Sequence, residues 1–193
     1  MSKNNKKVTY LAQAAMIASL YVVLTYAAHM AGLASGVIQV RISEALTILP
    51  FFTIAAVPGL AIGCVLANFL TGGHWIDIVF GSLASLIGAI LTYKIGRKAA
   101  SRERLRLKDQ SDVTNDDGKK AASRLRWLAP LPPIAANAII VPFILLFAYG
   151  LRPLWFSFVT VTIGQVISCG VLGMCLLLAL EKRKLRFWNE DGE

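Results

Sequence analysis

A small set of polar side chains interrupts the long apolar stretches of this sequence, and these side chains are the best candidates for chemistry. They are Gln39, Arg41, Glu44, Asn68, Asp77, Asn137 and Gln165. Polar groups inside a bilayer are costly unless they are paired or face a cavity. Carboxylates accept hydrogen bonds, a guanidinium donates them, and amides do both. The set therefore predicts a polar cavity, open to the outside, that binds a small polar molecule.

Each of these residues also has a purely structural interpretation. Arg41 and Glu44 stand three residues apart, which suits an ion pair along one helix. Asp77 stands where it could cap the start of a helix. Asn137 and Gln165 both fall roughly 15–20 Å below the outer surface at about 1.5 Å per residue, so they could face each other. An interhelical hydrogen bond between them would serve packing as well as binding.

The sequence contains no recognisable catalytic set. The histidines are His29 and His74, and no HExxH, GxSxG or phosphate-binding GxxxxGK[ST] pattern is present. The cysteines Cys64, Cys169 and Cys175 fall inside apolar stretches without metal-ligand spacing, which favours a packing role. We therefore predict no enzyme, no metal site, no bound cofactor and no ATP hydrolysis by this chain itself.

The distribution of charge indicates the elements that position these residues. Apolar residues make up 56% of the chain and the mean hydropathy is +0.61. Between positions 8 and 93 the only formal charges are Arg41, Glu44 and Asp77, and between 127 and 180 the only one is Arg152. Such stretches are typical of membrane spans. The net charge of +9 comes from basic residues flanking these stretches, which argues against nucleic-acid binding.

We expect an all-α integral membrane protein with a single domain, 1–193, and six transmembrane helices. The predicted spans are 8–31, 43–56, 58–70, 75–94, 130–149 and 154–180, with a charged connector at 95–126. Val57, Pro58 and Gly59 divide the apolar run 45–70, although one kinked span is the alternative. Six spans place the basic N-terminus, connector and C-terminal tail together in the cytoplasm, whereas five would place the tail outside.

The first span carries a stripe of small residues, defined here as Ala14, Ala15, Ala18 and Ser19. Small residues four apart let helices approach closely in lipid. The pattern does not say whether the neighbouring helix belongs to this chain or to a partner.

Four segments resemble the QueT family of substrate-binding (S) components of energy-coupling factor (ECF) transporters, which are associated with queuosine precursors. The segments are 38–50 (IQVRISEALTILP), 67–68 (AN), 77–84 (DIVFGSLA) and 133–138 (PIAANA). The resemblance covers nearly the whole chain apart from residues 99–126, which are longer and more charged than the family pattern.

The resemblance implies a six-helix S component in the cell membrane of a prokaryote, in contact with membrane lipid. It implies a 7-deazaguanine base as substrate, a transmembrane coupling subunit, and two ATPase subunits that use ATP. Glu44 or Asp77 would accept the two ring N–H donors, and the ring carbonyl would accept from Asn68, Asn137, Gln39 or Arg41. An aromatic side chain such as Trp75 would stack on the ring. The Ala14–Ala18 pair resembles the AxxxA contact by which S components dock.

Two other functions remain open at this point. One is an S component for another vitamin or nucleobase, and the other is an integral membrane enzyme or a structural subunit. The missing catalytic set argues against an enzyme, and the polar cavity argues against a structural subunit.

Overall fold

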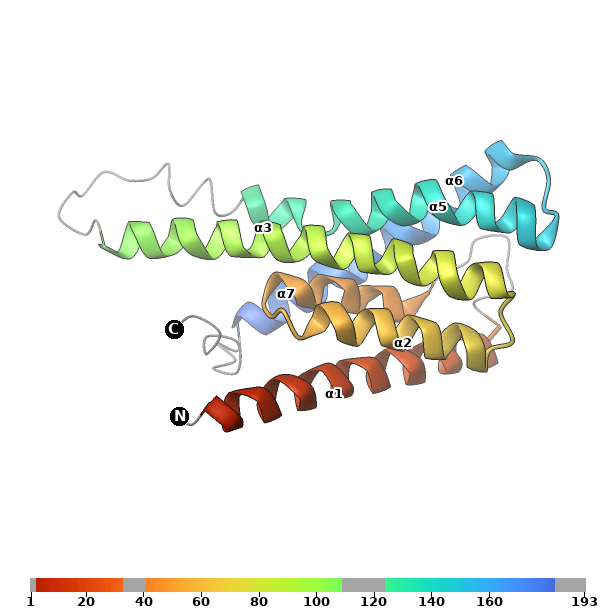
Figure 1. The fold of residues 1–193 in the computed structure, drawn as a ribbon. Coiled ribbons are helices and arrows are strands. Elements are labelled where there is room, and N and C mark those ends of the chain that lie inside the picture. Colours follow the sequence, from red (N-terminus) through yellow and green to blue (C-terminus); the bar gives the residue numbers. More distant parts are fainter. Residues whose placement is uncertain (1–2, 33–40, 109–123, 183–193) are drawn as a thin grey trace.

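The computed structural model describes residues 3–32, 41–108 and 124–182, and every regular element in these ranges is a helix. The elements along the chain are α1 (Lys3–Met30), η1 (Ile42–Phe51), α2 (Ala56–Leu70), η2 (Asp77–Gly81), α3 (Ser82–Lys108), α5 (Leu131–Tyr149), α6 (Leu154–Gln165), η3 (Val166–Leu172) and α7 (Gly173–Lys182). The helices lie side by side as a bundle (Figure 1), and the beginning of α1 and the end of α7 lie at the same end of it. This confirms the all-α class.

Within the described residues, four helical segments are long and apolar enough to cross a membrane, namely Asn4–Met30, Asp77–Arg102, Arg124–Tyr149 and Leu154–Lys182. The apolar helices η1 and α2 are shorter. At about 2.0 Å per residue for a 3₁₀-helix and 1.5 Å for an α-helix, each covers roughly 20 Å of the ~30 Å hydrocarbon core. The six-helix prediction is therefore supported in part: among the described residues, the four candidate spans together with η1 and α2 make six helical segments.

The helical structure is interrupted between η1 and α2 at residues 52–55. The sequence predicts this interruption slightly later, at Pro58. Pro58 lies in the first turn of α2, where its missing N–H has no intrahelical partner to lose. Toward the same end of the bundle, α3 continues as a helix to Lys108, well into the predicted connector. Residues 124–128 are helical again, and positions 109–123 lie outside the described residues.

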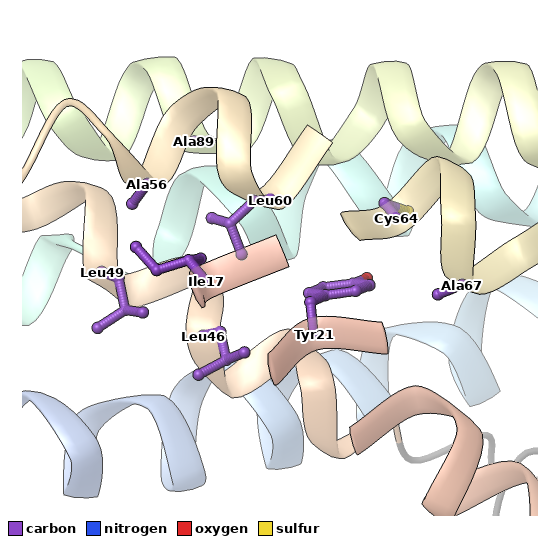
Figure 2. Close-up of a cluster of buried hydrophobic side chains, with 9 residues drawn as sticks. All are labelled: Ile17, Tyr21, Leu46, Leu49, Ala56, Leu60, Cys64, Ala67 and Ala89. Carbon is purple, nitrogen blue, oxygen red and sulfur yellow. The ribbon is translucent and has the colours of Figure 1, made fainter. Parts of the chain in front are cut away.

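The main apolar core lies where α1, η1 and α2 meet. Figure 2 shows Ile17 and Tyr21 of α1 beside Leu46 and Leu49 of η1, with Leu60 of α2 among them. All five side chains are buried, and Tyr21 and Leu60 are almost fully enclosed. This packing holds the short helix η1 inside the bundle, which matters because η1 carries Glu44.

Glycines of α2 let α1 approach closely. A Cβ atom at Gly59 would lie 2.7 Å from the Ala14 carbonyl oxygen, and one at Gly63 would lie 3.0 Å from the Ala18 carbonyl oxygen and 2.9 Å from Tyr21 Cβ. Atoms cannot pack at these distances, so the backbones touch only because both positions lack a side chain. The small residues of α1 and α2 thus form one interlocked contact.

Candidate functional site

A small cavity lies among the helices of the bundle, and it is walled by residues from several of them. It is lined by Arg41, Glu44, Gly81, Ser85, Asn137, Val141, Val161 and Gln165. These residues come from the start of η1 and from η2, α3, α5 and α6. The cavity volume is about 10 Å³, which is room for about one water molecule. In this conformation the site is closed around its own polar groups.

Glu44 is the hub of the polar groups at this cavity. Its side chain is 2% exposed. Oε1 accepts a hydrogen bond from the Tyr21 hydroxyl at 2.7 Å, and Oε2 accepts one from Asn137 Nδ2 at 3.3 Å. Burying a carboxyl group is tolerable when its oxygens are satisfied in this way. Residues from four elements far apart in the chain thereby form one hydrogen-bonded network around this carboxyl group, because Asn137 Nδ2 also donates to Gln165 Oε1 at 3.3 Å.

Arg41 and Asp77 form the charged edge of the same site. Arg41 Nη2 lies 3.6 Å from Asp77 Oδ2, and their side chains are 23% and 9% exposed. A Cβ atom at Gly81 would lie 2.9 Å from Asp77 Oδ1, so the glycine leaves room for the carboxylate. Asn68 Nδ2 donates to the Asp77 carbonyl oxygen at 3.4 Å. Arg41 therefore pairs with Asp77 across the bundle, rather than with Glu44 along one helix.

Two π-helical segments adjoin the site. Asp77 is the first residue of η2, and Gln165 immediately precedes η3. An extra residue per turn rotates the side chains that follow, and such π-segments are frequent at functional sites. Cys169 of η3 donates its thiol hydrogen to Gln165 Oε1 at 3.2 Å, which ties the π-segment to the polar network.

The structure brings together most of the residues that the sequence predicted for the site. These are Arg41, Glu44, Asn68, Asp77, Asn137 and Gln165, although Asn68 and Asp77 stand just behind the cavity wall. Trp75 is separate, because its side chain is 64% exposed and its recorded ring neighbour is His74. Gln39 lies outside the described residues.

Sequence reasoning missed several participants, of which Tyr21 is the most important. Tyr21 follows the small residue Ala18 by three positions on the face of α1 that packs against α2, and that spacing was the available signal. Ser85 follows Gly81 by one helical turn and lines the cavity. Val141 and Val161 supply an apolar wall and could not be told apart from other valines of their helices.

The stripe of small residues on α1 divides into two sides. Ala14 and Ala18 are 7% and 8% exposed and pack against α2. Ala15 and Ser19 are exposed, and the Ser19 hydroxyl donates to the Ala15 carbonyl oxygen at 2.9 Å. The role of the stripe in docking stays a prediction, and the side of it that the fold leaves exposed is formed by Ala15 and Ser19.

Comparison with known proteins decides the family. The QueT transporter family matches residues 11–182. The chain belongs to this family. A similar curated protein is the queuosine precursor transporter QueT of Lactococcus lactis subsp. cremoris (strain MG1363), with 37% identity over 73 residues. That match covers 38% of this chain and 43% of the length of the relative. No solved structure matches the chain.

Membership of the QueT transporter family confirms the resemblance found in the sequence. It places the chain in a family of transporters. The apolar helices agree with a membrane-embedded protein.

The hydrogen bond from Tyr21 to Glu44 can be tested by removing one hydroxyl. Tyr21→Phe leaves the buried Glu44 Oε1 without this donor. We expect a loss of about 1–3 kcal/mol in the free energy of unfolding, seen as a lower thermal unfolding midpoint in detergent. Tyr26→Phe is the matched control, because Tyr26 lies on the same helix and is 49% exposed. Equal midpoints for the two variants would contradict the role of this bond.

Proposed function

We propose that this chain is the substrate-capture subunit of an ECF-type ABC importer. It binds a queuosine precursor, a 7-deazaguanine base, from the outside, and delivers it inward when coupled to ATP-hydrolysing partners. The observation that carries this proposal is the buried carboxyl group of Glu44 at a cavity also lined by a guanidinium and two amides. Family membership and the similarity to the queuosine precursor transporter of Lactococcus lactis support the same class of substrate.

The polar groups of the site complement the hydrogen-bonding edge of a guanine-like base. Such an edge has two adjacent N–H donors and one carbonyl acceptor. The carboxylate of Glu44 accepts the two donors, and the guanidinium of Arg41 donates to the carbonyl. Asn137 now donates to Glu44 Oε2, so a ring N–H of the ligand replaces this bond on entry. Asn137 keeps Gln165 Oε1 as an acceptor when that happens.

Binding of a base requires the cavity to enlarge, because it now has room for about one water molecule. The apolar wall is where separation is cheapest. Val141 of α5 and Val161 of α6 pack in a small cluster of their own with Leu145, apart from the main core. Tilting α5 away from α6 at the level of these valines opens the cavity, keeps the hydrogen bond between Asn137 and Gln165, and leaves the α1–α2 contact intact. The flat ring then lies against the two valines, and its polar edge faces Glu44.

Transport by this chain needs partners that supply energy. The proposed assembly contains a transmembrane coupling subunit and two ATPase subunits, and ATP is used by these partners. The proposed location is the cell membrane of a prokaryote, with both termini in the cytoplasm. The first turn of α1 and the end of α7 lie at one end of the bundle (Figure 1), which supports an even number of crossings.

Competition binding tests the substrate class directly. The purified chain is expected to bind 7-deazaguanine bases at least 100-fold more tightly than thiamine, biotin or riboflavin. Of these ligands, only the 7-deazaguanine bases present two adjacent N–H donors to one buried carboxylate. Titration calorimetry gives the dissociation constants, and mass spectrometry identifies any small molecule that co-purifies. Tight binding of one of the vitamins, with no measurable binding of 7-deazaguanine bases, would make the chain an S component for a different substrate.

A further inference from the structure

The end of α3 carries a face of exposed basic side chains that the transport site does not use. We call it the α3 basic face, and it consists of Lys94, Arg97, Lys98, Arg102 and Arg104. At about 100° per residue these positions fall within about 160° of the helix circumference. Each of the five side chains is exposed. The five positive charges therefore gather on one side of the helix instead of being scattered around it.

The opposite side of α3 packs against other segments of the bundle, so the α3 basic face points away from the bundle. The Thr92 hydroxyl donates to the Ala129 carbonyl oxygen at 3.0 Å. Gly96 lies against the backbone of Phe51, where a Cβ atom would overlap it. Ala99 is buried. Within the part of the chain that the structure describes, the face therefore has no contact role and is open to the surroundings of this end of the molecule.

The membrane surface is what surrounds it. Lys94 stands about 26 Å along the helix from Asp77, and Arg104 stands about 40 Å from it. A hydrocarbon core of ~30 Å places Lys94 at the boundary and the later cations at and just beyond the headgroups. Trp127, which is 61% exposed and two residues from Ala129, marks the same level as an interfacial aromatic. In the view of Figure 1, α3 extends past the first turn of α1.

The α3 basic face keeps its charge within the part of the chain that the structure describes. The ion pairs recorded between described residues join Arg41 to Asp77 and Arg126 to Glu181, and neither involves a cation of this face. At the same end of the bundle, Arg126 is neutralised by Glu181 at 2.9 Å. Among the described residues, no carboxylate pairs with a cation of the α3 basic face, and these cations are available to an external anion.

We propose that the α3 basic face binds the headgroups of anionic phospholipids. Phosphate oxygens accept hydrogen bonds from lysine and arginine, and clusters of four to eight such residues beside a span bind acidic lipid surfaces. The partner is lipid because the helix itself delivers the cations to headgroup depth. Lipid bound there anchors the end of α3 and sets its height in the membrane.

Lipid titration followed by native mass spectrometry tests the proposal. The parent chain, purified in detergent, is expected to bind phosphatidylglycerol at least tenfold more tightly than phosphatidylcholine. Arg97→Gln/Lys98→Gln is expected to weaken phosphatidylglycerol binding by about 30-fold and to leave phosphatidylcholine binding unchanged. Both substituted side chains are exposed, so the fold is expected to survive, and an unchanged thermal unfolding midpoint verifies this.

The matched control removes two cations elsewhere on the same end of the bundle. Lys6→Gln/Lys7→Gln changes the net charge equally, and both lysines are exposed at the start of α1. This variant is expected to keep the parent's preference for phosphatidylglycerol. Equal losses in the two double variants would mean that net charge, not this face, attracts the lipid, and would overturn the proposal. A parent chain without any preference would also overturn it and would favour an acidic protein partner instead.

Discussion

A 7-deazaguanine base is expected to bind Glu44→Gln about 100-fold or more weakly than it binds the parent chain. The carboxylate presents oxygen to two neighbouring N–H donors, whereas an amide presents oxygen to one donor and N–H to the other. Glu44 is 2% exposed, so water cannot replace the lost acceptor. A ring N–H left facing another N–H loses its bond and keeps its desolvation cost. Titration calorimetry on purified protein measures the change in the dissociation constant.

Asp77→Asn is the comparison that assigns the carboxylate roles. Asp77 lies outside the cavity wall and contacts Arg41 at 3.6 Å, so its substitution acts on the ligand through Arg41. We expect a loss of about tenfold, in line with a weakened charge pair rather than a lost ligand contact. If Asp77→Asn costs more than Glu44→Gln, Asp77 is the acceptor. Parent-like binding by both variants would remove the carboxylate account altogether.

The polar site is largely predictable from the sequence because membrane burial makes polar residues rare. Asn137 and Gln165 stand out within apolar helices, and their similar depth indicated the pairing that the structure has at 3.3 Å. Asp77 and Arg41 are less predictable, since an arginine near a helix end can pair with several carboxylates. Arg41 could pair with Glu44, three positions later, or with Asp77, 36 positions later. Only the three-dimensional arrangement shows that Asp77 is the partner.

Tyr21 shows where prediction from the sequence ends. A tyrosine in an apolar helix suits the core, the membrane interface and a binding site equally well, because it has both an apolar ring and a hydroxyl. Its hydrogen bond to Glu44 depends on how closely α1 and α2 pack, and the glycines of α2 set that distance. The close packing of α1 on α2 also divides the α1 stripe into a buried side, Ala14 and Ala18, and an exposed side, Ala15 and Ser19. Small-residue spacing predicts a close contact but does not name the contacting helix.

Tryptophan substitutions on α1 are expected to separate folding from coupling. Ala14→Trp places a large side chain against α2, where a Cβ atom at Gly59 would already lie 2.7 Å from the Ala14 carbonyl oxygen. Overpacking of this kind costs more than the ~1–3 kcal/mol of a few extra methylene groups, so we expect a large loss of folded protein and of substrate binding. Size-exclusion profiles and thermal unfolding in detergent measure this loss.

Ala15→Trp is expected to have the opposite profile, because Ala15 is exposed on the other side of the same helix. The variant folds and binds substrate as the parent does, but uptake falls to background and the coupling subunit no longer co-purifies. A bulky side chain blocks the close backbone approach that a small-residue surface permits. Leu20→Trp is the control, because Leu20 is also exposed on α1 but is already large. Normal uptake by Ala15→Trp would place the docking surface on another helix, and equal loss in Leu20→Trp would mean that tryptophan anywhere on α1 disturbs the chain.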